Sequence, residues 1–200
     1  MKKVLFLILT LFLILYGCSN KEEQPEGKPI KVEQAKGKPI KDIEYDGENH
    51  LEIAVLGNDK AIEELSKSIS YDKYSIDELI KALEGNDARE YDAIIVFKDS
   101  FKSVDDDKYS DFFSALQYPV FLVGADNFRA YALYTKGSDI NKARDDTAPY
   151  VQGFKSNNSN EKSQAWSFDI PEEVDSKIIN KYALVNIFDI LDSEKSKEEE

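Results

Sequence analysis

The chain has 200 residues, of which 39 are acidic and 26 basic, and its formal net charge is −13. So negative a surface repels phosphate backbones, which argues against nucleic acid as a partner. Cys18 is the only cysteine and His50 the only histidine, so the composition excludes an intramolecular disulfide, a CxxC redox pair, a cysteine-based zinc site and a histidine-rich metal site.

Residues 1–17 have the layout of a secretory signal peptide. Lys2 and Lys3 are followed by an apolar run over residues 4–15 with one polar interruption. This run falls short of the about 20 apolar residues that a membrane-spanning helix needs. It leads into the tetrapeptide LYGC at residues 15–18, in which an aliphatic residue, a tolerant position and a small residue precede the cysteine.

The tetrapeptide resembles the lipobox of bacterial lipoproteins, and the resemblance covers only the signal peptide and Cys18. It implies that Cys18 takes a diacylglyceryl group, that the chain is cut just before it, and that the new amino end is often acylated, palmitate being a typical chain. Each buried methylene contributes about 0.8 kcal/mol, so two or three chains would hold the protein on the extracytoplasmic face of the cell membrane. The alternatives are a plain signal peptide with an incidental cysteine and an uncleaved anchor helix.

Residues 18–43 are expected to form a flexible tether that begins with the lipidated cysteine. The segment is mostly Lys, Glu, Gln, Pro and Gly, and so little apolar surface cannot offset the entropy of ordering it. Some 25 such residues reach roughly 25–30 Å on average, enough to lift a domain clear of the lipid head groups. The motif GKPIK occurs at 27–31 and again at 37–41, and an alternative is that each copy docks a partner.

Residues 44–191 are expected to form one α/β domain, followed by a charged tail over 192–200. The segment 51–57 (LEIAVLG) predicts a strand, and a helix is expected after it with one apolar face, formed by Ile62, Leu65 and Ile69. Ser75 and Glu78 have the spacing of a capping box, which predicts that a second helix begins there and ends at Gly85.

The segments 92–97 and 118–124 are apolar on both faces, which is typical of strands in a parallel sheet covered by helices. A helix capped by Ser103 and Asp106 is expected between them, and 128–134 is expected to form a further strand. This alternation predicts a single open, mostly parallel sheet with helices on both faces.

The last third of the domain has a less regular pattern. The segment 137–163 lacks periodicity and is expected to form a long loop. A strand over 164–170 and a final helix that begins at Pro171 or Asp175 complete the expected elements.

Three aspartates follow the three clearest strands: Asp59, Asp99 and Asp126. If those strands are neighbours, the carboxylates meet at the edge of the sheet where ligands of open α/β folds bind. Such a cluster could hold Mg²⁺ or Ca²⁺, or carry out acid–base chemistry. The competing interpretation is that each aspartate accepts a hydrogen bond from free backbone N–H groups at the start of the next helix or turn.

Aromatic side chains are abundant, and Tyr131, Tyr150 and Trp166 are candidates to line a groove for sugar or peptide. The alternative is that they pack in the core or at its rim. The chain has no G-x-S-x-G motif, P-loop or dinucleotide fingerprint, which leaves two hypotheses. The first is a lipid-anchored, non-catalytic module without a cofactor that binds an extracytoplasmic protein or small ligand, and the second is a divalent-metal-dependent extracytoplasmic hydrolase.

Overall fold

The computed structural model describes residues 31–34, 43–58, 60–65, 67, 69–84, 89–130, 133, 136–137, 143–156 and 163–198. The predicted signal peptide, Cys18 and most of the expected tether lie outside these ranges. Among the described helices, none is both long enough and apolar enough to cross a bilayer.

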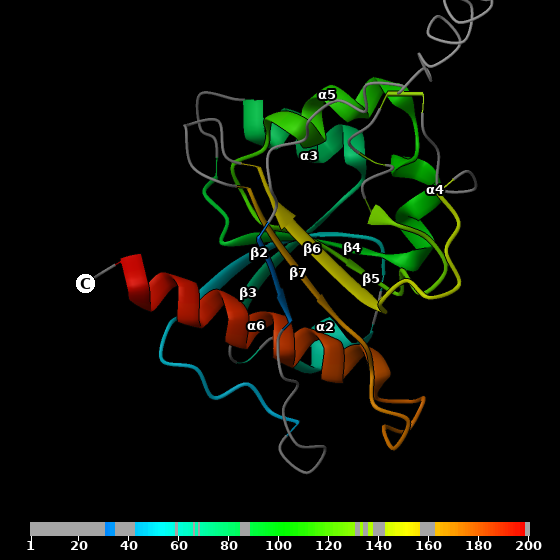
Figure 1. Cartoon of the computed structure of the whole chain (residues 1–200). Helices are drawn as coiled ribbons and strands as arrows, with labels where there is room; N and C mark the ends of the chain where they lie inside the picture. Colours follow the sequence, from blue (N-terminus) through cyan, green and yellow to red (C-terminus); the bar gives the residue numbers. More distant parts are fainter. Residues whose placement is uncertain are drawn as a thin grey trace, which may run out of the picture.

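Seven strands form one mixed sheet in the order β1–β7–β6–β5–β4–β2–β3 (Figure 1). Four neighbouring strands, β3, β2, β4 and β5, run parallel, whereas β6 is antiparallel to both β5 and β7, and β1 is parallel to β7. The strand bounds are β1 Lys31–Gln34, β2 Leu51–Leu56, β3 Ile69–Tyr74, β4 Ala93–Phe97, β5 Val120–Val123, β6 Val151–Lys155 and β7 Gln164–Phe168. The prediction of a single, mostly parallel sheet is confirmed.

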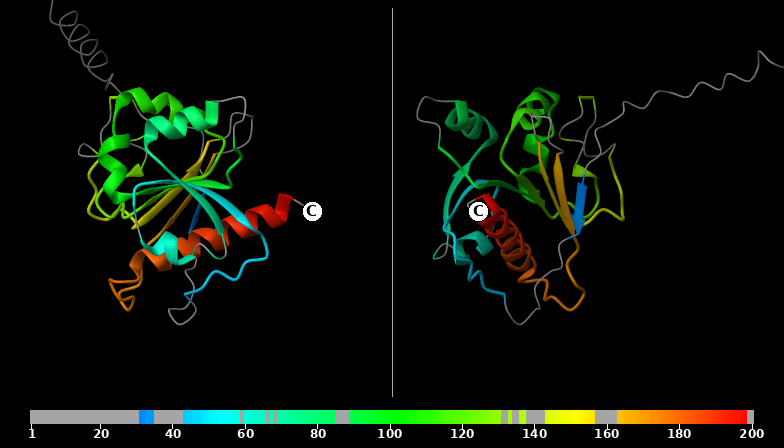
Figure 2. Two further views of the ribbon diagram at one scale, coloured as in Figure 1. Left: turned by 180° about the vertical axis from the view of Figure 1, so that it is seen from behind. Right: turned by 60° about the vertical axis from the view of Figure 1, so that its left-hand side comes forward.

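Helices cover both faces of the sheet, as predicted. In Figures 1 and 2, α2 and α6 lie on one side of the sheet, and α3, α4 and α5 lie on the other. One apolar cluster joins α2 and α6 to their face, and a second joins α3, α4 and α5 to the opposite face. The helix bounds are α2 Lys60–Leu65, α3 Ile76–Glu84, the 3₁₀ turn η1 Lys98–Ser100, α4 Phe101–Val104, α5 Asp107–Ala115 and α6 Ile179–Glu198.

The strand order reverses at β2. The chain passes from β2 to β3 on one side and then crosses back to β4 on the other side of β2, by way of α2 and then α3. The carboxyl ends of β2 and β4 therefore form the topological switch point, where open α/β sheets commonly bind ligands.

The capping box at the start of α3 is confirmed. The Ser75 backbone N–H donates to a Glu78 carboxylate oxygen at 2.8 Å, and the Glu78 N–H donates to Ser75 Oγ at 3.4 Å. The strands over 92–97 and 118–124 are also confirmed as β4 and β5, in which all residues are buried. These features depend on a few adjacent residues, so local sequence is sufficient to predict them.

The expected helix with Ile69 on its apolar face is too long. α2 ends at Leu65, and Ile69 begins strand β3, which pairs with β2 from Leu51↔Ile69 to Leu56↔Tyr74. The helical spacing of Ile69 is therefore coincidental, because pairing with a distant strand buries this side chain.

The segment after β5 also differs from the prediction. The described residues of 128–134 form no strand, and Phe128 makes only an isolated bridge to Arg144. Instead β6 lies inside the expected long loop, where the buried Gln152 side chain donates to the carbonyls of Ala125 and Phe128 at 3.1 and 2.8 Å. These side-chain hydrogen bonds satisfy loop carbonyls that a strand ladder would otherwise pair.

Two expected helices begin elsewhere. Asp106 alone caps α5, by accepting from the Lys108 N–H at 3.0 Å, whereas Ser103 Oγ donates to the Ser100 carbonyl within the preceding turns. The final helix begins at Ile179, after turns in which the Val174 and Ile178 N–H groups already donate to Pro171 and Asp175 carbonyls.

The expected boundaries of the domain are too narrow at both ends. Residues 192–198, expected as a charged tail, continue α6, and Asp192 bonds to Asn49. Residues 31–34, expected within the flexible tether, form β1 and pair with β7 along the whole strand. Both segments gain their order from distant partners, which composition alone does not reveal.

Candidate functional site

The structure brings the ends of β2, β4 and β5 together, as the strand-end hypothesis required, but it gives the described carboxylates structural partners. Asp99 Oδ2 accepts the Asn58 backbone N–H at 3.1 Å, and Asp126 forms an ion pair with Lys98 at 3.0 Å. Asp59 lies outside the described residues. Within the described ranges, no group of three or more His, Cys, Asp or Glu side chains could hold a metal ion.

Gly57 explains how Asp99 reaches the end of β2. Its φ is +101°, and a Cβ on this residue would lie 2.3 Å from Asp99 Oδ1. The absent side chain lets the Asp99 carboxylate approach the backbone that leads into α2. The capping interpretation expected Asp99 to bond to the helix that follows it, but η1 and α4 have no side-chain cap, and Asp99 instead accepts a backbone N–H from the segment after β2.

Of the three aromatic groove candidates, the structure describes Trp166 and Tyr150. Trp166 is 4% exposed and packs on Phe121, with ring centroids 5.4 Å apart. The Tyr150 hydroxyl donates to Oδ1 of Asn180, in the first turn of α6, at 2.7 Å. Tyr131 lies outside the described residues. Both side chains pack on one apolar cluster, and Trp166 also lines a hollow beside β6 and β7.

The only histidine of the chain has a serine beside it, which the sequence did not indicate. His50 Nε2 lies 2.8 Å from Ser70 Oγ and 3.5 Å from a Glu52 carboxylate oxygen. The contact arises because Glu52 and Ser70 are opposite each other in the β2–β3 register. The same ring nitrogen faces both groups, whereas a catalytic triad uses one nitrogen for the serine and the other for the acid.

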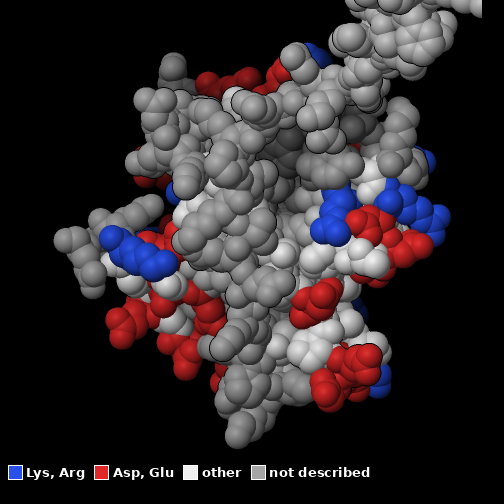
Figure 3. All heavy atoms as spheres, viewed as in Figure 1, with Lys and Arg blue, Asp and Glu red and all other residues white. Residues whose placement is uncertain are grey.

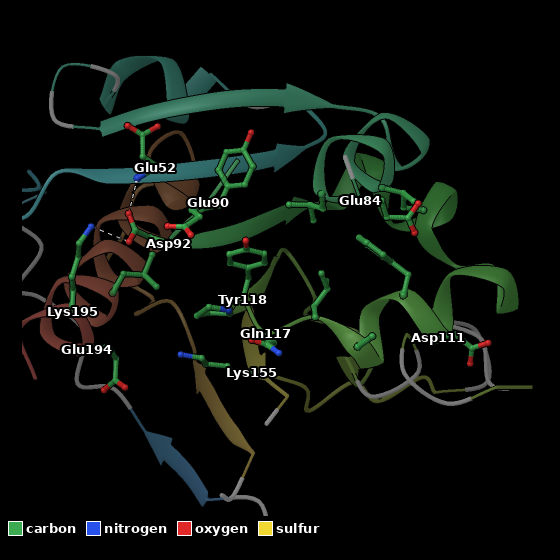
Figure 4. A pocket seen from close by; sticks show the side chains of 18 of the residues that line it. Glu52, Glu84, Glu90, Asp92, Asp111, Gln117, Tyr118, Lys155, Glu194 and Lys195 are labelled. Carbon is green, nitrogen blue, oxygen red and sulfur yellow. Dashed lines mark hydrogen bonds and ion pairs between the residues drawn. The ribbon is translucent and has the colours of Figure 1, made fainter. Parts of the chain in front are cut away.

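A cavity of about 1180 Å³ lies at the opposite edge of the sheet, where β2, β4 and β5 begin (Figure 4). Its walls come from α3, α5, the C-terminal half of α6 and the segments that precede β4 and β5. The lining residues are Glu52, Ile80, Leu83, Glu84, Glu90, Tyr91, Asp92, Lys108, Asp111, Phe112, Ala115, Leu116, Gln117, Tyr118, Pro119, Lys155, Leu191, Glu194 and Lys195. This cavity is the candidate functional site.

The floor of the cavity is apolar. Four side chains that are only partly buried pack on the core cluster beneath: Ile80, Leu83, Phe112 and Tyr118. Helix α5 adds Ala115 and, just beyond its last turn, Leu116. Apolar side chains that converge on a hollow without being fully buried leave surface that a ligand can cover.

Two phenols contribute to the site. The Tyr91 hydroxyl lies 2.7 Å from that of Tyr74 and donates to Asp72 at 3.1 Å. Burial, together with the bond to Tyr74, raises the pKa of Tyr91, and burial beside the Glu90 carboxylate raises the pKa of Tyr118. Both phenols therefore stay protonated at neutral pH and add no charge to the site, and the Tyr91 hydroxyl is bonded to Tyr74 and Asp72, which do not line the cavity.

One end of the cavity is held by a hydrogen-bonded ion pair. Asp92 pairs with Lys195 of α6 at 3.0 Å, and its other carboxylate oxygen accepts the Glu52 backbone N–H at 2.8 Å. Figure 4 shows both interactions. Burial disfavours the charged form of nearby Glu194, but hydrogen bonds from Lys197 and Gln164 outweigh this effect and lower its pKa.

The charge of the site is negative. Among the lining residues that the structure describes, six carboxylates outnumber three ammonium groups. The face of the domain seen in Figure 3 likewise carries several groups of acidic side chains, in keeping with the net charge of −13. The titratable groups of the described lining are carboxylates, ammonium groups and two phenols.

This cavity was not predicted from the sequence, because it lies where the strands begin and the predicted site lies at their carboxyl ends. The available signal was the pair of segments Glu90–Asp92 and Gln117–Pro119, in each of which a tyrosine follows a polar residue just before an apolar strand. Comparison with known proteins found no matching family model, curated protein or solved structure.

Proposed function

We propose that the chain is a lipoprotein held by acyl chains on Cys18 at the extracytoplasmic face of the cell membrane, and that its α/β domain is a non-catalytic binding module. The ligand site is the cavity where β2, β4 and β5 begin. The observation that carries the binding role is the combination of a partly exposed apolar floor with a rim of charged groups in one hollow.

The anchor part of the proposal is supported by the sequence of residues 15–18 and by charge. Cleavage before Cys18 removes Lys2 and Lys3, so the net charge of −13 would become about −15 in the mature protein. A domain this acidic is repelled by anionic head groups, so acyl chains rather than surface charge would hold it at the membrane.

The anchor is tested with Cys18→Ser in cells that express the full chain. Wild type and a Ser19→Ala control are expected to incorporate a labelled palmitate analogue and to partition with membranes. The Cys18→Ser chain is expected to carry no label and to remain unprocessed or leave the membrane fraction. A Cys18→Ser chain that is still cleaved and lipidated would refute the anchor.

The binding role is tested with a photo-crosslinking amino acid at position 112, on the cavity floor, in the full chain on intact cells. The control carries the same amino acid at position 173, an exposed site in the segment before α6, away from the cavity. Adducts are expected from position 112, and Leu83→Asp should abolish them by placing a charge on the floor. Equal adducts from both positions, or none from 112, would contradict a binding site in the cavity.

A further inference from the structure

We infer that the occupant of the cavity is a basic, amphipathic helical segment of another extracytoplasmic protein, with its apolar side chains on the floor and its Lys or Arg side chains against the rim. The inference rests on the proposed function and names the ligand class for that site. Its two parts, the shape of the floor and the charge of the rim, are independent observations.

The floor has the form of a groove between two helices. Ile80 and Leu83 lie three residues apart on α3, and Phe112, Ala115 and Leu116 follow the i, i+3, i+4 spacing along α5. Side chains at these spacings share one helix face, so each helix contributes one apolar face to the cavity. A third amphipathic helix placed against both faces buries its own apolar face, which is a recurrent mode of peptide recognition.

The volume of the cavity favours a peptide over a small molecule. Sites for small molecules typically measure about 300–1,000 Å³, whereas this cavity measures about 1180 Å³. It has room for several side chains at once, which a helical segment supplies from a single face.

The rim selects for positive charge. Glu84 and Glu90 line the cavity and form no salt bridge with any other described residue, whereas Lys195 is neutralised by Asp92. Figure 4 shows Glu84 and Asp111 at one end of the cavity, and Glu52, Glu90 and Asp92 at the other, with Tyr118 between them. Asp92 is paired with Lys195 and Asp111 with Lys136, so among the described residues the charge that a ligand can pair with comes from Glu84 at one end and Glu90 at the other. These two carboxylates attract a ligand with cationic side chains flanking apolar ones and repel an acidic ligand.

The net charge also separates a protein partner from a membrane. An apolar surface can dock on a membrane when basic side chains surround it, because these attract anionic lipid. The apolar floor here belongs to an acidic domain, which anionic lipid repels. The complement of this surface is therefore a cationic segment of a protein.

The test uses the lipidated full chain in phosphatidylcholine vesicles, with protein-free vesicles as background. The probe is a fluorescein-labelled peptide of about 14 residues, or four turns, with Leu and Lys at helical spacing. Its counterparts carry Gln or Glu in place of Lys, or the same composition in scrambled order. Fluorescence anisotropy is expected to show saturable binding of the Lys peptide and no binding of its counterparts. The affinity for the Lys peptide should fall at high salt.

Two matched double variants assign the site. Glu84→Gln/Glu90→Gln is expected to weaken binding of the Lys peptide roughly tenfold, because two rim charges are lost. Glu172→Gln/Glu173→Gln removes the same charge from the exposed segment before α6 and should leave binding unchanged. Thermal unfolding midpoints within a degree or so of wild type would show that both variants are folded.

The remaining outcomes separate the inference from the proposed function. Equal or tighter binding of the Gln or Glu peptide, blocked by Leu83→Asp, would overturn the basic partner and keep the cavity as a binding site. Binding of the Lys peptide that neither Leu83→Asp nor the rim variant affects would overturn the site assignment. No binding of any peptide, or recruitment of protein to anionic vesicles, would overturn the inference, while crosslinking from position 112 would still decide the proposed function.

Discussion

Asn49 donates two hydrogen bonds to one carboxylate oxygen of Asp192, from its backbone N–H at 2.9 Å and from its side-chain amide at 2.8 Å. The Tyr45 hydroxyl also donates to this oxygen, at 3.3 Å. The contacts join the segment that enters β2 to the C-terminal half of α6, 143 residues later in the chain. Burial disfavours the charged form of Asp192, but the hydrogen bonds from Asn49, Glu48 and Tyr45 together outweigh this effect and lower the pKa of Asp192.

Replacing Asp192 with alanine should therefore destabilise the domain. Loss of a charged acceptor for three donors is expected to lower the free energy of unfolding by about 1–3 kcal/mol. Asp192→Asn, which keeps an acceptor oxygen, should cost less. Urea denaturation monitored by circular dichroism measures both values. Equal stability of wild type and Asp192→Ala would show that the hydrogen bonds of Asp192 contribute nothing to folding.

Gly57→Ala should destabilise the protein more than Gly137→Ala. Both glycines have positive φ, +101° and +78°, which costs an alanine about 1–2 kcal/mol. Only at Gly57 would the new Cβ also meet Asp99 Oδ1, at 2.3 Å, whereas nothing lies within 4 Å at Gly137. The clash should add roughly 1–3 kcal/mol. Thermal unfolding of the two variants measures the difference, and equal midpoints would argue against close approach of Asp99.

Asp145 should contribute a pH-dependent part of the stability. Hydrogen bonds from Thr147, together with the bond from Arg129 at 2.6 Å, lower the pKa of Asp145 to about 2 from its usual 3.8. The unfolded state therefore takes up this proton first, so the stabilisation is complete above about pH 4–5 and is lost as the pH falls toward 2. In Asp145→Asn, stability should fall less steeply across this window.

The matched control for this pH effect is Asp146→Asn. Asp146 is the adjacent residue, its side chain is 80% exposed, and its pairing with Arg144 is at the surface. Chemical denaturation at several pH values between 2 and 6 compares the three proteins. A wild-type slope in Asp145→Asn, or a flattened one in Asp146→Asn, would be inconsistent with the assignment.

Asp99 should behave as a hydrogen-bond acceptor for the Asn58 N–H and not as a metal ligand. Asp99→Ala removes this acceptor and is expected to lower the free energy of unfolding by about 0.5–1.5 kcal/mol. The midpoint of thermal unfolding of the wild type should be the same with Mg²⁺, Ca²⁺ or a chelator. A ligand at 100 times its dissociation constant stabilises by about 2.7 kcal/mol, so a shift that Asp99→Ala abolishes would be clear evidence for the metal hypothesis.

Trp166 should report on the core. The indole is 4% exposed and packed on Phe121, so its emission should be blue-shifted and poorly quenched by acrylamide in the native protein. Trp166 is the only tryptophan, so the whole signal comes from this position. Quenching by acrylamide as efficient as that of free tryptophan would show that Trp166 is exposed, as the groove hypothesis requires.

The local features of the fold could be predicted from the sequence because a few neighbouring residues determine them. Ser75 and Glu78 are three residues apart, and their side chains satisfy each other's N–H groups whatever else the domain does. The continuous apolar runs of β4 and β5 likewise require burial on both faces, and that requirement implies a parallel sheet with helices on either side.

Tertiary structure decided the elements that depend on distant partners. Ile69–Tyr74 and Val151–Lys155 carry mixed apolar and polar residues that alone favour no single state, and they form strands because β2 and β5 supply open edges for pairing. The cavity is of the same kind, since its floor and rim come from α3, α5 and α6 and from the starts of three strands. Sequence determines which residues need burial or a hydrogen-bond partner, whereas the folded chain determines which distant residue provides it.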